Sequence, residues 1–482
     1  MKKFTLLFGT ALLTSVSAIS QNEIDALRYS QIAFGGTARF SSMAGSMGAL
    51  GGDISSLSFN PGGIAVFRKT EFSITPAIFS ERTSSTYNST NSVDSKLNFN
   101  IGNLGFVTAF ILSEGNKSGW ESLNFGVGYS RNNNFQNRTS IQGNNKSNSL
   151  LDTYVADANG HTSSSFDLFS TDLAWQTYLI NPNTDSIHYS HVIKNYGELQ
   201  KKSVETSGSM GETDISFGGN YRSKVFVGLT LGIANVRYHE SSEYGESDET
   251  DTINNFNSFT LSQNLNTSGS GANFKFGMIV KAAEWLRIGA AIHTPTVIDL
   301  SDSYNSSMES HLDSGRIYSA KSPEGSFNYS VTTPFRALGS VGFVIDKLAL
   351  INIEYEFVDY SLAQLNSNPE VFSDVNKTIR SKYTAANNIR VGGEIRFDPL
   401  AFRFGYALYG SPFKNGVNAD ASRTSITAGI GFREANYFVD FADVYTRYTN
   451  YEYLYNPAGL ELNPVKKEFN SSNFMLTFGF RF

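Results

Sequence analysis

The chain has 482 residues, of which 13% are aromatic but only 17% are charged, and its formal net charge is −6. The negative charge argues against nucleic acid as a partner, because no basic stripe is available to neutralise phosphates. The absence of cysteine excludes disulfides, thiol catalysis and cysteine-based zinc sites. Abundant Phe, Tyr and Gly favour strands and turns.

Residues 1–20 have the form of a secretory signal peptide. Two lysines precede an apolar stretch over 4–16, and Ala18 and Ser20 form a small-residue cleavage site that would leave Gln21 first in the mature chain. No later run of 18 apolar residues exists, which excludes a membrane-spanning helix. A membrane-embedded mature chain must therefore be a closed β-barrel, because lipid cannot satisfy an open sheet edge.

Residues 21–67 do not have the pattern of a strand. Small residues dominate from Ser41 to Asp53, with a helical turn or two expected over 40–50. The chain then breaks at Asn60-Pro61-Gly62-Gly63, which is either a hinge or a rigid turn before the first strand. This compact, weakly charged segment is expected to lie inside the barrel as a plug.

Alternating apolar and polar residues recur over residues 68–482. One example is the segment 348–360, in which two opposite faces are formed by Ile351, Ile353, Tyr355 and Phe357 and by Asn352, Glu354 and Glu356. In a soluble sheet the polar face would meet water, whereas in a transmembrane barrel the apolar face meets lipid and the polar face lines the lumen. The alternation predicts a transmembrane antiparallel β-barrel of about 14 strands, an even number.

The predicted strands lie near 70–82, 97–112, 120–132, 212–223, 225–240, 255–281, 286–298, 322–346, 348–360, 386–397, 401–409, 423–433, 436–447 and 470–482. Two of them are long, and we interpret each as one bent strand, with the bends at Gly269 and Gly271 and at Pro334. Tight turns and long polar connections alternate, which is typical of an outer-membrane barrel. The short-turn rim would face the periplasm and carry both chain termini.

The largest connection, residues 133–211, contains apolar residues at the spacing of an amphipathic helix. The candidates for a ligand-capture surface are Phe166, Phe169, Leu173, Trp175 and Leu179. The alternative is that these side chains only pack the loop against itself.

Charges of both signs fall on the predicted lumen face of neighbouring strands. They are Glu354, Glu356, Arg390, Glu394, Arg396, Arg403, Asp440 and Arg481. Ion pairs across the lumen would brace and partly fill it; the alternative is that the charges line a wet pore. Fourteen strands are also fewer than the 16–18 of barrels with a wide aqueous channel.

The last strand has Phe at 474, 478, 480 and 482 on one face. A terminal Phe482 on an alternating strand resembles the recognition signal of outer-membrane barrels, which implies the barrel assembly machinery as a partner.

A family resemblance is carried by the N-terminal segment. The matching runs are Ser41-Ser42-Met43-Ala44-Gly45, Ala49-Leu50-Gly51-Gly52-Asp53 and Ser56-Leu57-Ser58-Phe59-Asn60-Pro61-Gly62-Gly63-Ile64-Ala65. They resemble the hatch of the FadL-type long-chain fatty acid transporter family, although that family usually has Asn-Pro-Ala where this chain has Asn-Pro-Gly. The segments 286–295 and 333–336 also resemble family strands.

The resemblance implies a 14-strand barrel with a hatch over 21–67 and no enzymatic activity. It implies uptake of fatty acids, other lipids or aromatic hydrocarbons across the outer membrane of a Gram-negative bacterium. Loops would capture the ligand, the hatch would move, with Asn60, Pro61 and Gly62 as gating residues, and the ligand would exit laterally near a kinked strand. Gly126 and Gly128 are candidates for that kink.

The six histidines are scattered, and the sequence has no cofactor-binding, P-loop or nucleophile-elbow motif. We therefore expect no catalysis, cofactor or metal, and a monomer in contact with outer-membrane lipid. The alternatives to an importer are an adhesin or structural barrel that uses the 133–211 loop, and a general porin.

Overall fold

The structure is a computed structural model that describes residues 21–112, 118–313, 315–346, 348–367, 372–418, 421–455 and 462–482. The predicted signal peptide, residues 1–20, lies outside the described residues. Within the described chain, no helix is long and apolar enough to cross a membrane.

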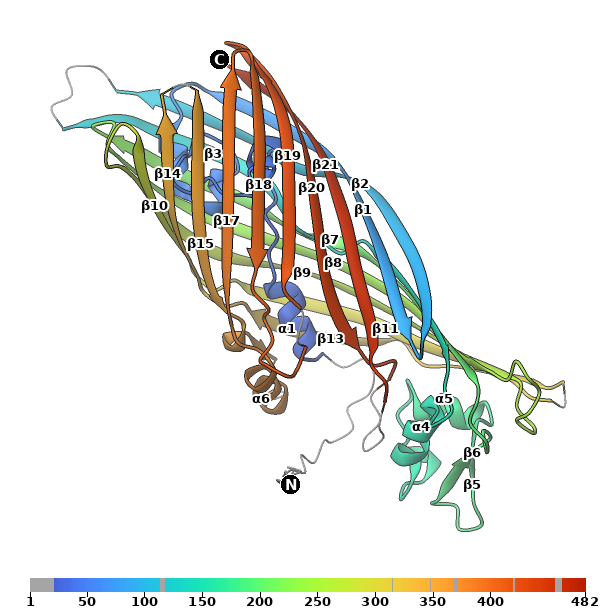
Figure 1. Ribbon diagram of the computed structural model, residues 1–482. Helices are drawn as coiled ribbons and strands as arrows, with labels where there is room; N and C mark the ends of the chain where they lie inside the picture. The colour runs from blue at the N-terminus through green and yellow to red at the C-terminus, as the bar shows by residue number, and fades with distance from the viewer. Residues whose placement is uncertain are drawn as a thin grey trace, which may run out of the picture.

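The wall of the molecule is a closed antiparallel barrel of fourteen strands, as the alternation predicted (Figure 1). Pairing of β1 with β21 closes it. The twelve continuous strands are β1 (Glu71–Tyr87), β2 (Thr90–Ile111), β3 (Trp120–Asn134), β7 (Leu199–Tyr221), β8 (Val225–Ser247), β9 (Ser258–Lys281), β15 (Ala349–Asp359), β17 (Ala385–Phe397), β18 (Leu400–Tyr409), β19 (Arg423–Arg433), β20 (Tyr437–Glu452) and β21 (Val465–Arg481).

Two strands of the wall are interrupted. One consists of β10 (Leu286–His293) and β11 (Val297–His311), and the other of β13 (Gly325–Thr332) and β14 (Arg336–Ile345). The bend predicted at Pro334 falls in the second interruption. The bend predicted in β9 is wrong, because β9 pairs with β8 without a register shift through Gly269 and Gly271.

The remaining elements are short. The strands are β4 (Asn137–Asn144), β5 (Ile180–Pro182), β6 (Tyr189–His191), β12 (Ile317–Lys321) and β16 (Gln364–Asn366). The helices are α1 (Glu23–Ser30), α2 (Ala38–Ser42), α3 (Ser56–Phe59), α4 (Leu150–Ala158), α5 (Thr171–Gln176) and α6 (Ser373–Lys382), with 3-10 turns η1 (Pro61–Val66), η2 (Ser163–Ser165) and η3 (Tyr360–Leu362).

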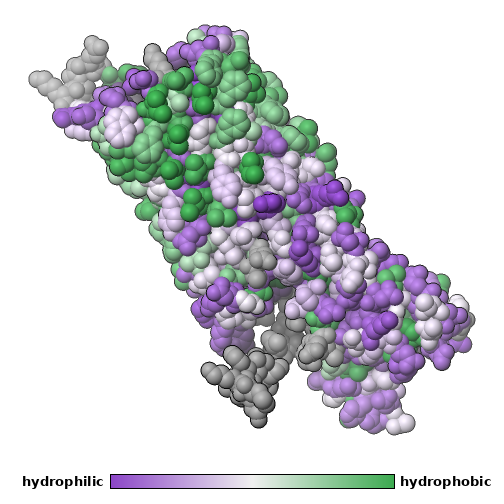
Figure 2. Space-filling view, in the orientation of Figure 1, coloured by the Kyte–Doolittle hydropathy of each residue, from purple (hydrophilic) through white to green (hydrophobic). Residues whose placement is uncertain are grey.

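The polarity of the wall is the reverse of that in a soluble protein. On β15, Ile351, Ile353 and Tyr355 are 43–45% exposed on the outer face, whereas the inward Glu354 and Glu356 are at most 4% exposed. On the face shown in Figure 2, apolar side chains gather over the half of the barrel that carries the short turns, and hydrophilic side chains cover the other half. Such a surface is stable only where lipid surrounds it.

The structure corrects the extent of the predicted loops. Within the range 133–211, β3 continues to Asn134, β4 pairs with β7, and β7 already begins at Leu199. Likewise β11 continues to His311, inside a segment predicted as a loop. These strand extensions lie beyond the apolar belt and have polar outer faces, so they lack the apolar outer face on which the prediction depends.

The prediction that both termini lie at the short-turn rim is wrong for the start of the described chain. Helix α1 lies at the opposite end of the barrel, next to α6 (Figure 1). Its Glu23 carboxylate pairs with the Lys382 ammonium of α6 at 2.5 Å. The N-terminal segment therefore runs along the lumen from the long-loop end to the short-turn end before β1 begins.

Candidate functional site

The N-terminal segment fills the lumen between α1 and η1. A capping box starts α1, because the Asn22 side chain accepts from the Ile24 N–H and Asp25 accepts from the Asn22 N–H. Thr37 caps α2 through the Phe40 N–H. Nearly all residues from α2 to η1 are buried against inward-facing side chains of the barrel.

The predicted gating residues form a tight contact between the segment and the wall. The Asn60 side chain accepts from the Gly62 N–H at 3.0 Å and donates to the Gly48 carbonyl at 2.6 Å. A Cβ on Gly62 would lie 2.9 Å from the Met278 Cα of β9, and one on Gly228 of β8 would lie 2.1 Å from the Pro61 carbonyl oxygen. Glycine at both positions lets the turn lie directly on the wall.

The predicted lumen charges lie inside the barrel and form ion pairs. Glu394 is fully buried and pairs with Arg403 at 2.5 Å, with Arg396 at 2.5 Å and with Arg39 of α2 at 3.0 Å. Arg403 continues the network to Asp440 at 2.7 Å. Because Arg39 belongs to the N-terminal segment, this network attaches the segment to the wall.

The other predicted lumen charges pair in the same way. Arg390 contacts Glu354 at 2.6 Å and Glu356 at 3.1 Å. At the short-turn rim, Arg481 pairs with Glu71 at 2.8 Å.

A third buried charge cluster was missed by the sequence analysis. Lys275 of β9 pairs with Glu212 at 2.7 Å and with Asp214 at 3.0 Å, and all three side chains are buried. Asp214 also accepts a hydrogen bond from Ser58 of α3. The alternation within 212–223 could have placed Glu212 and Asp214 on the lumen face.

A cavity of about 40 Å³ lies between the N-terminal segment and this cluster. Its polar wall includes Asn132, Glu212, Asn273, Lys275, His293, Arg336 and Glu356, and its apolar wall includes Ile32, Phe59, Met210, Ala234, Ile298 and Pro334. A benzene ring occupies a cavity of about 150 Å³ in a protein core. The cavity is therefore closed to a ligand of that size in this conformation.

Both interruptions of the wall border the cavity. The β10–β11 interruption at residues 294–296 lies opposite the β13–β14 interruption at residues 333–335, since β10 pairs with β14 and β11 with β13. Each contains a proline, which has no N–H for the ladder. Threonine hydroxyls take the place of ladder carbonyls as acceptors beside the interruptions: Thr294 Oγ1 accepts from the Phe274 N–H and Thr333 Oγ1 from the Thr296 N–H.

The third strand is not interrupted at the predicted kink. Gly126 and Gly128 pair in regular register with both β2 and β7. The register with β7 shifts instead between Trp120 and Ser122 and between Arg131 and Asn133. At the second shift, the Ala33 N–H of the N-terminal segment donates to the Asn132 carbonyl at 2.8 Å.

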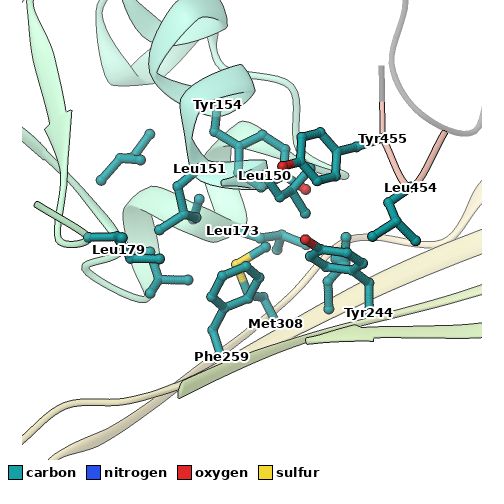
Figure 3. Packing of buried hydrophobic residues seen from close by; sticks show 14 of the residues in the cluster. Leu150, Leu151, Tyr154, Leu173, Leu179, Tyr244, Phe259, Met308, Leu454 and Tyr455 are labelled. Atoms are coloured by element: carbon teal, nitrogen blue, oxygen red, sulfur yellow. The ribbon is translucent and has the colours of Figure 1, made fainter. Parts of the chain in front are cut away.

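Residues 145–198 form a small folded unit, the loop domain, at the long-loop end of the barrel. Its core includes Leu151, Leu173 and Leu179 and is completed by side chains from the strand ends, such as Tyr244 and Phe259 (Figure 3). The barrel extensions thus provide the platform on which the loop domain folds.

The predicted capture surface is wrong at three positions. Phe166, Leu173 and Leu179 are buried in the loop-domain core and present no surface. Phe169 is half-buried against Tyr304. Trp175 is exposed, together with its neighbours Leu168 and Tyr178.

Comparison with known proteins finds the same architecture. A scan against protein-family models and a search of curated proteins each found no match. The toluene transporter TodX of P. putida is similar over 93% of this chain and 99% of its own, with a TM-score of 0.54 and 12% sequence identity. A FadL homologue of Pseudomonas aeruginosa is similar over 94% and 99%, with a TM-score of 0.56 and 12% identity.

The fold and the filled lumen define the class of protein, a transmembrane β-barrel of fourteen strands whose interior is occupied by its own N-terminal segment. Barrels of this kind, with an apolar outer belt, belong to the outer membrane of Gram-negative bacteria. The particular fold is the FadL-type fold, as the resemblance predicted.

Proposed function

We propose that this protein takes up hydrophobic molecules passively across the outer membrane, and that it is a monomer without enzymatic activity. The observation that carries the proposal is the partly apolar cavity enclosed in a plugged lumen. The two similar structures of the preceding section, one of them a toluene transporter, have the same fold and support this function. Pairing of β1 with β21 closes the barrel within one chain, so no second chain is needed to complete the wall.

Movement of the N-terminal segment is the second part of the proposal. The segment forms one side of the cavity through Tyr29, Ser30, Ile32, Ser58 and Phe59. Because the cavity is smaller than a benzene ring requires, the segment has to shift before a ligand enters. In this proposal the segment therefore acts as a hatch.

Ligand capture is assigned to the exposed apolar residues of the loop domain, Leu168, Trp175 and Tyr178. An apolar ligand gains about 0.8 kcal/mol for each CH₂ group that it buries. A small apolar surface is therefore sufficient to concentrate hydrophobic molecules at the outer end of the barrel.

Lateral exit is assigned to the paired interruptions of the wall. Thr294, Thr296 and Thr333 line the cavity on the inside. On the outside, the neighbouring Phe274, Val297 and Phe335 are exposed apolar side chains. A ligand that passes between the interrupted strands would leave into lipid without crossing water.

The test is uptake of radiolabelled toluene and oleate in a deletion strain that carries the wild-type gene or a Thr296→Cys/Thr333→Cys variant. The Thr333 N–H donates to the Thr296 carbonyl at 2.9 Å, so the two positions are adjacent and suit a disulfide. The chain has no other cysteine. We expect the wild-type gene to restore uptake, and the oxidised variant to lose uptake and regain it on reduction.

The control is Ser262→Cys/Ser307→Cys, which joins opposite residues of β9 and β11 away from the cavity. Oxidation of this control should leave uptake unchanged. Full uptake by the oxidised Thr296→Cys/Thr333→Cys variant would place the exit elsewhere. Equal uptake with and without the wild-type gene would reject transport and favour the adhesin alternative.

A further inference from the structure

Glu212 orients two asparagine side chains in the cavity wall. Its carboxylate accepts from Asn132 Nδ2 at 2.9 Å, from Asn273 Nδ2 at 2.7 Å and from Lys275 Nζ at 2.7 Å. A carboxylate in these ion pairs only accepts hydrogen bonds, so each asparagine must turn its NH₂ group to Glu212 and its carbonyl oxygen away.

The two amide oxygens have no partner of their own. Within the described residues, Asn132 Oδ1 and Asn273 Oδ1 are buried without a hydrogen bond, as is the Ser30 hydroxyl on the opposite, N-terminal side of the cavity. Buried polar atoms are normally paired, so an unpaired one calls for a partner such as a bound water, an ion or a ligand. The cavity wall therefore offers acceptors to a ligand that brings a donor.

The cations of the cavity, by contrast, are already neutralised. Lys275 lies between Glu212 and Asp214. Arg336 pairs with Glu356 at 2.9 Å and donates to the Ser30 carbonyl.

Behind them Arg390 pairs with Glu354 and Glu356, so this region has three cations against four carboxylates. His293 directs Nε2 to the Phe59 carbonyl at 2.9 Å. A carboxylate ligand would find no free cation among these groups and would meet two amide oxygens.

We propose that the cavity selects uncharged apolar molecules that carry a hydroxyl group, such as phenols or alcohols, over carboxylate anions. The hydroxyl would donate to Asn132 or Asn273, and the apolar body would contact Phe59, Met210 and Ile298. This proposal rests on the uptake function proposed above and names its substrate class.

The test compares three probes with one ring and different head groups: toluene, 4-cresol and 4-toluate. Equilibrium dialysis of the purified protein in detergent, against protein-free micelles at neutral pH, measures their binding. We expect 4-cresol to bind about five- to tenfold more tightly than toluene, the effect of one added hydrogen bond. 4-Toluate should bind more weakly than both.

Asn273→Leu removes one of the two acceptors and should reduce the advantage of 4-cresol over toluene, while toluene binding is retained. Asn264→Leu, in the same strand but outside the cavity, is the matched control. Heat-modifiable gel mobility verifies that both variants fold. If a variant does not fold, the comparison of the three probes on the wild-type protein still tests the proposal.

The outcomes separate the two proposals. Binding of 4-toluate as tight as that of 4-cresol, or no advantage of 4-cresol over toluene, would overturn the hydroxyl preference and leave uptake standing. The second result would mean that water satisfies the amide oxygens. Absence of binding by all three probes, together with unchanged uptake in the deletion strain, would reject the transport function itself.

Discussion

Glu394 shows how single residues hold the N-terminal segment in the lumen. Its carboxylate is shared by Arg39, Arg396 and Arg403, and only Arg396 of these is substantially exposed. Removing one partner of a buried ion pair is costly because the other charges stay desolvated. Glu394 is thus a contact between hatch and wall whose loss would affect both.

We predict that Glu394→Gln lowers the free energy of unfolding by about 3–5 kcal/mol, the usual cost of breaking a buried pair. Chemical denaturation in detergent micelles measures the change. Lys377→Gln is the matched control, because Lys377 pairs with Asp374 at 2.8 Å on the exposed α6. Its loss should cost less than about 1 kcal/mol. Equal losses in the two variants would contradict the structural role of the Glu394 network.

Sequence reasoning predicted charges of both signs in the lumen and ion pairs among them, but it missed the partner that comes from the N-terminal segment. Alternation alone fixes the face on which Glu394 and Arg403 lie, since the side-chain period of a strand is two. It cannot reveal Arg39, because that residue comes from a helix of the plug and not from a strand. The cavity could not be predicted either, because it forms where the N-terminal segment meets residues of β3, β7, β8, β9, β10, β11, β14 and β15.

At the scale of elements, the loop domain depends on a buried carboxyl group. Glu198 is fully buried, its Oε2 accepts from the Gly197 N–H at 2.9 Å, and Oε1 has no partner within the described chain. Burial, with a contribution from nearby Glu246, raises the pKa of Glu198 from its ordinary value of 4.5 to about 8. The folded loop domain therefore holds a proton that the unfolded chain releases at lower pH.

The sign of the pH dependence follows from this shift. Between pH 4.5 and about 8 the folded domain binds a proton that the unfolded chain has lost, so its stability falls as the pH rises. We predict that hydrogen exchange of residues 149–198, corrected for the intrinsic pH effect, is faster at about pH 8 than at about pH 5. Glu198→Gln should reduce this difference; Glu246, whose pKa burial also raises, accounts for the remainder. An undiminished difference in the variant would assign it to another group.

Elements inside the membrane were predictable, and those outside it were not. Lipid on one face and ion pairs on the other impose a strict alternation, which is why all fourteen strands of the wall were found. Beyond the belt the outer face meets water and is polar, so the extensions of β7 and β11 were predicted as loops. The bend predicted at Gly269 was wrong. A Cβ at this position of β9 would lie 2.2 Å from the Asp299 carbonyl oxygen of β11, so the glycine permits the close approach of these two strands instead.

At the scale of the whole molecule, the filled lumen distinguishes this barrel from an open porin. Helices α2 and α3 and turn η1 pack against strands around the barrel, including β3, β7, β8, β19 and β20. Buried ion pairs occupy much of the remaining cross-section. Ions have no continuous wide path through such an interior, whereas in the proposed function a small ligand would pass after a local shift of the segment.

We therefore predict that the intact protein gives no steady ion conductance in planar bilayers. A variant that lacks residues 23–52, folded as judged by heat-modifiable gel mobility, should conduct, because removal of α1 and α2 empties the middle of the lumen. Steady conductance by the intact protein would support the general porin. If neither protein conducts ions, the charges that project from the wall, and not the N-terminal segment, block the barrel.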